Sequence, residues 1–394
     1  MEKKSFWQTQ LTRRDFIVKG LAGLAGVGVG AYLLERYLKR SPTTLNLQEG
    51  APKPELGQWS HEAYHYSVLG NNVQCHVCPN QCLLEEGKRS ICRNKTNKNG
   101  KLYTLVYGNP AAVHVDPIEK KPLFHFLPGT KAFSVGTAGC NLRCLNCQNW
   151  EISQEYPERT TNMDLMPDSV VKNAADSGSK SIAYTYNEPI AFYEYMYETS
   201  KLARDAGIKN VMVTNGYILE EAHRDLAKYT DAASINLKSF SEDTYGKLNS
   251  GHLQPVLDTL KRMKEMDKWF EVINLVVPTW TDDMGMIKDM SQWLYKNIGP
   301  DYPLHFTRFF PMYKVTHLNE TPLSVLEQAR KTALDEGLHF VYIGNVPGTD
   351  YENTYCPKCS KLIVERKGYV VTQQYIVSSA CKFCGEKIAG VWEA

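Results

Sequence analysis

The stretch Cys140-Asn141-Leu142-Arg143-Cys144-Leu145-Asn146-Cys147 carries the strongest chemical signal in the sequence. Its spacing is C-x3-C-x2-C, and it follows the strand-like residues 132–136 and the turn Thr137-Ala138-Gly139. Three thiolates on one short loop can bind three irons of a [4Fe–4S] cluster, which leaves the fourth iron open to a small molecule. The alternatives are three reduced buried thiols or a zinc site completed from elsewhere. Zinc is disfavoured because no fourth cysteine lies nearby.

The chain contains 11 cysteines, and they fall into three groups with none left over. Besides the central three, there are two groups of four: Cys75, Cys78, Cys82 and Cys92, then Cys356, Cys359, Cys381 and Cys384. Short C-x2-C spacings of this kind are typical of metal binding rather than of a disulfide framework. Because such thiols must stay reduced until they bind metal, we expect assembly in a reducing compartment.

Each group of four thiolates can close the coordination sphere of a metal. The first group, spaced C-x2-C-x3-C-x9-C, fits a structural zinc or an electron-relaying cluster, and its short loops favour zinc. The last group consists of two C-x2-C knuckles separated by 21 residues, as in zinc ribbons and rubredoxins. Zinc would be structural there, and iron would be redox active.

Length and charge exclude some classes of function. The chain has 394 residues, 43% of them hydrophobic, which is enough for one large domain with appendages. A net charge of +2 argues against a surface that coats nucleic acid. The C-terminal cations could still contact nucleic acid, but they fit an ordinary solvated face better; they are Lys358, Lys361, Arg366, Lys367 and Lys382.

The N-terminus resembles a twin-arginine export signal. Arg13 and Arg14 precede Phe16, and a glycine-rich uncharged run extends over 20–34. Residues 1–40 are therefore predicted to be a signal or membrane anchor, so that the protein is exported or membrane-associated. Anchoring on the cytoplasmic face stays open, because no A-x-A cleavage site is evident and 15 apolar residues are few for a full span. Residues 41–60 are predicted to be a linker.

Strand-like and helix-like segments alternate from residue 131 onward, which predicts parallel β/α units. The expected strands are 132–136, 181–186, 210–215, 232–237, 271–277, 304–310 and 340–343, and the expected helices are 167–177, 190–206, 219–229, 242–267, 283–297 and 322–336. Six or seven repeats are fewer than a closed barrel needs, so we predict an α/β fold with a partial (β/α)6-type barrel over 131–350. A small N-terminal four-cysteine module with its lead-in would occupy 61–130, and a zinc-ribbon or rubredoxin-like module 351–394.

Two further segments carry polar residues whose role is open. Residues 115–129 are bounded by prolines and are predicted to be ordered and non-helical. Within them, His125 is flanked by phenylalanines and is expected to be a hydrogen-bonded core histidine, while Asp116 fits a turn cap. His305 and Arg308 should face opposite sides of one strand, and Arg308 fits a substrate anion or a structural ion pair equally well.

The cysteine spacing and its flanks resemble the radical S-adenosylmethionine (SAM) enzymes, which are built on such a partial barrel. Over roughly residues 75–392 the chain resembles more closely the radical SAM component of the AmmeMemoRadiSam system, whose members are described as similar to pyruvate formate-lyase activating enzymes. The most specific stretches are 116–126, 139–153 and the closing knuckles. The N-terminal segment departs from most such relatives.

This resemblance implies both a reaction and a set of site residues. A [4Fe–4S] cluster on Cys140, Cys144 and Cys147 would cleave SAM reductively, and the radical would abstract hydrogen from an unknown substrate. Residues at the strand ends would contact SAM: Asn187, Glu188, Asn215, Asn236 and Lys238. Asn187 and Glu188 also fit a helix cap, and Asn236 stands where related enzymes usually have Asp.

The resemblance also implies partners. The reaction needs an electron donor of flavodoxin or ferredoxin type, and Memo-like and AMMECR-like proteins are associated with the family. Activation of a glycyl-radical enzyme is the narrower alternative function. An iron–sulfur electron-transfer protein that leaves SAM intact is the alternative of another class.

Overall fold

The protein was analysed as a computed structural model that describes residues 51–393. The predicted signal or anchor over 1–40 and the first part of the predicted linker, residues 41–50, lie outside the described residues. Among the helices of residues 51–393, none is both long and apolar enough to cross a membrane.

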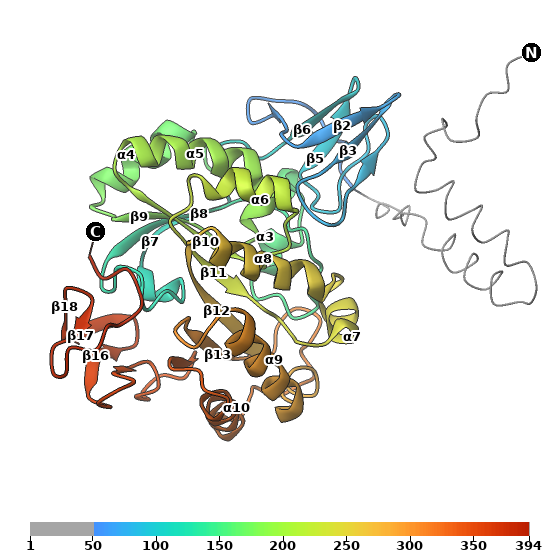
Figure 1. Cartoon of the computed structure of the whole chain (residues 1–394). Helices are drawn as coiled ribbons and strands as arrows, with labels where there is room; N and C mark the ends of the chain where they lie inside the picture. Colours follow the sequence, from blue (N-terminus) through green and yellow to red (C-terminus); the bar gives the residue numbers. More distant parts are fainter. Residues whose placement is uncertain (1–50, 394) are drawn as a thin grey trace, which may run out of the picture. The chain divides into compact units, whose positions relative to one another are not determined.

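One eight-stranded sheet forms the centre of the described chain (Figure 1). Its strands run in the order β14-β13-β12-β11-β10-β9-β8-β7, and all neighbours are parallel except β7 and β8. The strands are β7 (Ala112–Pro117), β8 (Lys131–Gly136), β9 (Ser181–Tyr184), β10 (Lys209–Thr214), β11 (Ala232–Asn236), β12 (Trp269–Val276), β13 (Leu304–Arg308) and β14 (Val341–Gly344). Seven consecutive parallel strands confirm the prediction of a parallel α/β core.

The helices form an arc around the strands (Figure 1). The longer ones are α4 (Pro167–Asp176), α5 (Tyr193–Asp205), α6 (Glu220–Ala227), α8 (Leu253–Glu265), α9 (Met284–Asn297) and α10 (Leu323–Asp335). Each buries one apolar side, as periodic helix-forming segments should. The strands read as continuous apolar runs because both faces of a parallel sheet are covered. Five of the six predicted helices therefore occur, and the sixth is interrupted.

The single helix predicted over 242–267 is wrong. The segment divides into α7 (Glu242–Thr244), a π-helical turn η4 (Tyr245–Asn249) and α8. Ser250 between them has a left-handed φ of 57°, which a continuous helix does not accommodate. The turn also uses its carbonyls outside the helix, since the N–H of Arg143 donates to Asn249 O (3.0 Å). The loop that carries Cys140, Cys144 and Cys147 therefore contacts the chain where the predicted helix is interrupted.

Strand β7 was not predicted, although its segment was expected to be ordered and non-helical. It pairs antiparallel with β8 at the edge of the sheet, and a short 3-10 turn η1 (Ile118–Lys120) follows it. Asp116 does not cap a turn. Its carboxylate binds Lys120 Nζ (2.9 Å), Lys121 Nζ (2.6 Å) and the hydroxyl of Tyr186 (2.5 Å), and hydrogen bonds from these partners hold its pKa below the ordinary value even though burial alone would raise it.

Two small three-stranded antiparallel sheets make up an N-terminal module, defined here as residues 61–104. One sheet contains β1 (His61–Glu62), β6 (Lys101–Thr104) and β5 (Lys95–Lys98), and the other contains β2 (Tyr66–Leu69), β3 (Asn72–Cys75) and β4 (Leu83–Leu84). The first four-cysteine group lies on β3 and the loops that follow it. No helix occurs in this short segment, so its fold relies on its cysteines and its contacts with the barrel.

The C-terminal segment forms a second small β module. Its strands are β15 (Thr354–Tyr355), β16 (Leu362–Lys367), β17 (Val370–Gln374), β18 (Ile376–Val377) and β19 (Ala380–Cys381). Their apolar side chains pack with Phe340 and Tyr342 at the start of β14. The module therefore lies at the amino ends of the barrel strands, away from their carboxyl ends.

His125 is a buried, hydrogen-bonded core histidine, as predicted. Its ring contacts Ala389 O and Tyr342 Oη, both at 2.7 Å, and burial lowers its pKa to about 4. His305 is equally buried and contacts Glu271 Oε2 at 2.7 Å. Arg308 instead bonds to Thr321 O (2.8 Å) and pairs with Glu320 (3.5 Å). Arg308 therefore takes part in a structural ion pair, which is one of the two roles predicted for it.

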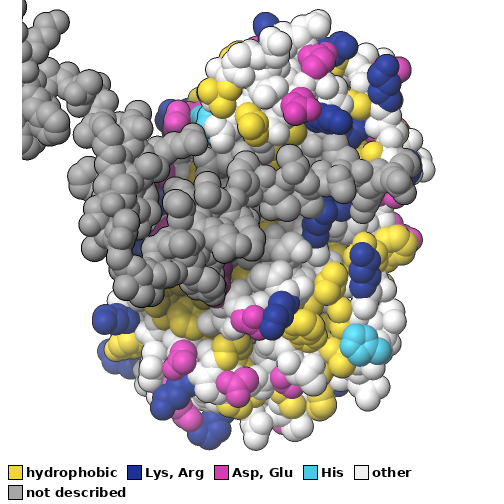
Figure 2. Space-filling model, turned by 90° about the vertical axis from the view of Figure 1, so that its right-hand side faces the viewer, with side chains coloured by type: hydrophobic (Ala, Val, Ile, Leu, Met, Phe, Trp, Pro, Cys, Tyr) yellow, Lys and Arg dark blue, Asp and Glu magenta, His cyan; other side chains and the backbone are white. Residues whose placement is uncertain are grey.

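The cations of the C-terminal module do not form one face. Arg366 is only 2% exposed, and its guanidinium donates to the carbonyls of Phe124 (2.7 Å) and Glu352 (3.0 Å). The inclusion of Arg366 in a solvated basic face is therefore wrong. Figure 2 draws the side of the molecule away from this module, and where that surface is described, cationic and acidic side chains are interspersed rather than separated by sign. Neither observation provides a basic patch for nucleic acid.

Candidate metal centre

The central cysteine loop, defined here as residues 137–149, connects β8 to the short helix α3 (Trp150–Ser153). It lies at the carboxyl end of a parallel strand, where β/α folds place their working residues. Cys140 and Cys144 are buried, and Cys147 is partly buried. Burial raises the pKa of the Cys140 thiol, so this thiol stays protonated until a metal binds it.

Hydrogen bonds to sulfur orient the loop. The backbone N–H of Leu142 donates to Cys140 Sγ (3.4 Å), and Asn249 Nδ2 donates to Cys144 Sγ (3.2 Å). Such donors favour the thiolate and tune a cluster bound to it. Asn249 belongs to the π-helical turn η4. The interruption of the predicted helix therefore positions the side chain that donates a hydrogen bond to Cys144 Sγ.

Asn187 holds the first turn of the loop. Its Oδ1 accepts from Thr137 N (3.1 Å), and its Nδ2 donates to Gly139 O (2.7 Å). Gly139 has a φ of +95°, and a Cβ there would lie 2.1 Å from the carbonyl oxygen of Cys92. Only glycine allows the central loop to approach the N-terminal module this closely.

Gly139→Ala should consequently destabilise the protein by at least about 1–3 kcal/mol and lower iron occupancy. The added methyl group would meet backbone, which cannot rotate away as a side chain can. Gly178→Ala is the matched control, because Gly178 also has a positive φ (+68°) but open space around it. Chemical denaturation and iron analysis measure both effects, and equal losses in the two variants would contradict the close approach.

Glu188 lies in the loop that follows β9 and caps the short helix η3 (Pro189–Phe192). Its carboxylate accepts hydrogen bonds from Thr214 Oγ1 (2.6 Å), Asn215 N (2.7 Å) and Ile190 N (3.1 Å). Burial raises its pKa from 4.5 to about 7, while these donors and the charge of Lys238 oppose the rise. Glu188 therefore caps a helix, as one of its two predicted roles requires. Its carboxylate is also buried beside the cysteine loop.

The other predicted SAM contacts gather around the same point. Asn215 Nδ2 donates to Asn141 Oδ1 (2.8 Å) within the cysteine loop, and Asn236 Nδ2 donates to Thr214 O (3.2 Å). Lys238 is half-buried, and its charge lowers the pKa values of both Cys147 and Glu188 against the stronger effect of burial. The structure thus brings all five residues to one end of the sheet, beside the three thiols.

Sequence reasoning missed several residues of this site. Asn141 lies inside the cysteine motif and donates to Tyr217 O (2.9 Å), while Asn149 donates to Tyr186 O (2.5 Å). Tyr186 has a φ of 71°, rare for a bulky residue and typical of a constrained site. The asparagines of the motif were visible as polar residues in a buried loop, but their partners come from distant segments that no local pattern identifies.

The C-terminal cysteines have the geometry of a mononuclear site. Their four sulfur atoms all lie within 4.8 Å of one another, with 3.6 Å between Cys356 and Cys384 and 3.8 Å between Cys359 and Cys381. A tetrahedral site with Zn–S bonds of 2.3 Å requires sulfur separations of about 3.8 Å. These residues therefore fit a single zinc or iron ion.

The three central thiols have no such geometry. Within residues 51–393, no set of three or more potential ligands other than the C-terminal one is drawn together that closely. A [4Fe–4S] cluster does not require that spacing, because each thiolate binds a different iron. The donor set of Cys140, Cys144 and Cys147 is thus suited to a cluster with one open iron.

Comparison with known proteins agrees with this class of site. A family model described as the Radical SAM superfamily matches residues 134–290, so the chain contains a radical SAM domain. It is 45% identical over 332 residues to the uncharacterized protein MJ0808 of Methanocaldococcus jannaschii, which covers 83% of this chain and 98% of that protein. The chain belongs to the same family as that protein.

More distant similarity points to activating enzymes. The chain is 22% identical over 178 residues to the pyruvate formate-lyase-activating enzyme of Staphylococcus aureus, which is 42% of this chain and 70% of the enzyme. Among solved structures, a domain of such an enzyme from Bacteroides vulgatus has a TM-score of 0.38 at 17% identity, over 42% of this chain and all of that one. SuiB from Streptococcus suis bound to S-adenosylmethionine has a TM-score of 0.43 at 14% identity, over 58% and 53%. Both scores are low, and the assignment does not depend on them.

Proposed function

We propose that this protein is a radical SAM enzyme that cleaves SAM reductively and abstracts hydrogen from a substrate of its own. The observation that carries the proposal is the convergence of Cys140, Cys144 and Cys147 with the buried Glu188 at the carboxyl end of the sheet. When bound by these thiolates, a [4Fe–4S] cluster supplies the one-electron reduction that breaks the sulfonium C5′–S bond, giving methionine and a 5′-deoxyadenosyl radical.

The residues of the chain would bind and orient SAM. Glu188 would accept hydrogen bonds from the α-ammonium group, because it is a buried carboxylate close enough to act electrostatically on Cys140. Lys238 would balance the charge of the SAM carboxylate. Asn187 and Asn215 would contribute indirectly, since their amides hold Gly139 and Asn141 of the cysteine loop in position. The buried surroundings would limit side reactions of a radical intermediate.

The proposal is tested by the products. Anaerobically reconstituted protein is mixed with SAM, with and without dithionite, and 5′-deoxyadenosine and methionine are measured by chromatography. We expect both products in equal amounts, and only with the reductant. A reduced, iron-loaded protein that leaves SAM intact would overturn the proposal and favour an electron carrier.

SAM affinity should fall as the pH is lowered through about 7. The pKa of Glu188 is raised to about 7 by burial, so below that pH the carboxyl is neutral and no longer attracts an ammonium group. Lys238 and the Cys140 thiol are the other titratable groups in electrostatic contact with it. Equilibrium binding at pH 6 and pH 8 measures the effect.

Glu188→Gln is the control for this pH dependence. It should weaken SAM binding about 10–100-fold at pH 8, the value of a charge-assisted hydrogen bond, and should flatten the pH profile. An unchanged profile in the variant would show that another group controls binding.

Activation of a glycyl-radical enzyme is the second candidate, favoured by the similarity to pyruvate formate-lyase-activating enzymes. It predicts a glycyl radical signal when a glycyl-radical enzyme is incubated with this protein, SAM and reductant. We also propose a low-potential electron donor of flavodoxin or ferredoxin type and Memo-like and AMMECR-like partner proteins. Membrane association or export through the N-terminus is part of the same proposal.

A further inference from the structure

We propose that Cys75, Cys78, Cys82 and Cys92 bind a second iron–sulfur cluster, which relays an electron to the central cysteine loop. The sequence favoured zinc at these four residues, and the geometry points the other way. The relay rests on the proposed function only for the destination of the electron. The identity of the metal group does not depend on it.

The first argument is the spacing of the thiols. The four thiols are not grouped as closely as those of the C-terminal set, the one set within residues 51–393 whose four sulfur atoms lie within 4.8 Å of one another. A four-iron cluster, in which each sulfur binds its own metal, does not require the close tetrahedral spacing of a single ion.

The second argument is the direct contact between this group and the central loop. Asn94 accepts from Cys92 Sγ (3.0 Å) and donates to Ala138 O (2.9 Å), so one side chain bridges the two loops. Asn80, between Cys78 and Cys82, donates to Asn141 O (2.7 Å). A structural zinc has no need of this proximity, whereas a relay requires it.

The third argument is the cationic character of the junction. Arg93 is buried and Arg143 is partly buried. Arg93 Nη2 donates to Gln154 Oε1 (3.1 Å), and Gln154 Nε2 donates to Leu142 O (3.2 Å), so Arg93 lies beside the loop that carries Arg143. Arg93 Nη1 and Arg143 Nε are buried and have no hydrogen-bond partner. Two neighbouring cations with unpaired donors call for anionic groups between them. Anionic clusters on the two sets of thiolates would supply that charge.

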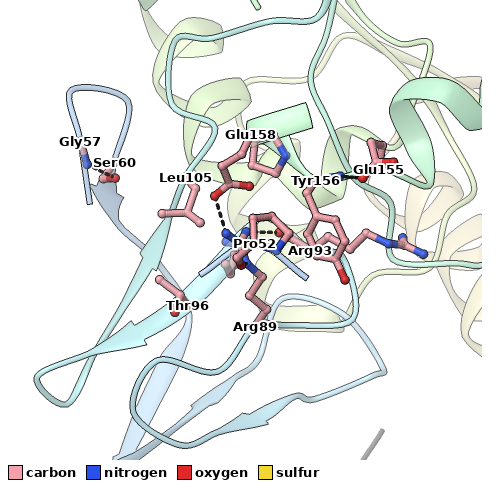
Figure 3. Close-up of polar contacts among 12 residues, drawn as sticks. Pro52, Gly57, Ser60, Arg89, Arg93, Thr96, Leu105, Glu155, Tyr156 and Glu158 are labelled. Carbon is pink, nitrogen blue, oxygen red and sulfur yellow. Dashed lines mark hydrogen bonds and ion pairs between the residues drawn. The ribbon is translucent and has the colours of Figure 1, made fainter. Parts of the chain in front are cut away.

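The N-terminal module is also joined to the segment that follows the central loop. Figure 3 shows Arg89 reaching the carbonyls of Pro52 (3.2 Å) and Arg93 (2.8 Å) and the carboxylate of Glu158, which follows the central loop in the chain. Its guanidinium lies 5.3 Å from the Tyr156 ring centroid. The contacts with Glu158 and Tyr156 thus tie the chain on both sides of the central loop to the module that carries the other four thiols.

The redox step balances as a transfer of one electron. A low-potential one-electron donor of flavodoxin or ferredoxin class reduces the N-terminal cluster. That cluster then returns to its oxidised state by passing the electron to the cluster on Cys140, Cys144 and Cys147. No bond is made or broken in the relay itself.

Metal analysis of the anaerobically reconstituted full chain tests the inference. With two four-iron clusters and a single zinc or iron ion at the C-terminal site, we expect about eight irons and one zinc, or about nine irons, per chain. About four irons with two zincs, or about five irons with one zinc, would overturn the inference. This count uses the unaltered chain, so it does not depend on whether a variant folds, and it stands even if SAM is never cleaved.

Two variants assign the iron to its site. Cys82→Ala should lose about half the iron together with any electron paramagnetic resonance (EPR) signal of a cluster that ignores SAM, whereas Cys384→Ala should lose only the single metal ion of its own site. With reduced flavodoxin as donor, SAM cleavage by Cys82→Ala should fall at least about tenfold further than with dithionite. Loss of zinc rather than iron from Cys82→Ala, or equal losses with the two donors, would contradict the inference.

Discussion

Cys144→Ala is expected to lower formation of 5′-deoxyadenosine and methionine by more than about 100-fold. Cys144 is buried, and its sulfur already accepts a hydrogen bond from Asn249 (3.2 Å). No other cysteine of residues 51–393 belongs to this loop besides Cys140 and Cys147, so no thiol can replace it. The cluster should consequently be lost or lack one ligand, and product analysis after dithionite reduction measures the loss.

Cys384→Ala provides the comparison for Cys144→Ala. It also removes one thiol from a metal-binding group, but that group has the compact geometry of a single ion. We expect Cys384→Ala to lose the single metal ion of its own site while the SAM-sensitive iron signal persists. If Cys144→Ala cleaved SAM as fast as the unaltered protein, the assignment of the catalytic site would be wrong.

Lys95→Met is expected to reduce the free energy of unfolding by about 3–5 kcal/mol. Lys95 in the N-terminal module forms an ion pair with Glu194 at the start of α5, and their side chains are 2% and 0% exposed. Glu194 also accepts from Tyr64 N (3.1 Å). Removing the lysine leaves a buried carboxylate without its cation, and this desolvated charge is the source of the cost. Denaturant titration under anaerobic conditions measures it.

The double variant Lys95→Met with Glu194→Met separates this cost from the value of the pair. Replacing both charges by apolar side chains of similar size should recover most of the lost stability, because neither charge is then buried alone. A single variant that loses less than about 1 kcal/mol would show that the pair does not join the module to the barrel.

The central fold could be predicted because its signals are local. Buried parallel strands such as β12 are continuous apolar runs, and helices such as α9 are amphipathic over many residues. The C-x3-C-x2-C spacing likewise lies within eight residues. The positions of Asn187, Glu188 and Asn215 followed from the rule that strand ends carry function.

The remaining features depend on contacts between distant segments. Strand β7 lies at the edge of the sheet, and its polar residues His114 and Asp116 obscure the apolar pattern. The π-helical turn at Tyr245–Asn249 exists because the cysteine loop bonds to it. The contact of Cys92 with Gly139 joins two loops 47 residues apart. No periodicity in the sequence records such packing.

The central claim is that SAM binds at an open iron of a cluster held by Cys140, Cys144 and Cys147. EPR spectra of the dithionite-reduced, anaerobically reconstituted protein, recorded with and without SAM, test it most directly. We predict a [4Fe–4S]⁺ signal that shifts when SAM is added. A reduced cluster whose spectrum ignores SAM would contradict the claim and leave an electron-transfer protein.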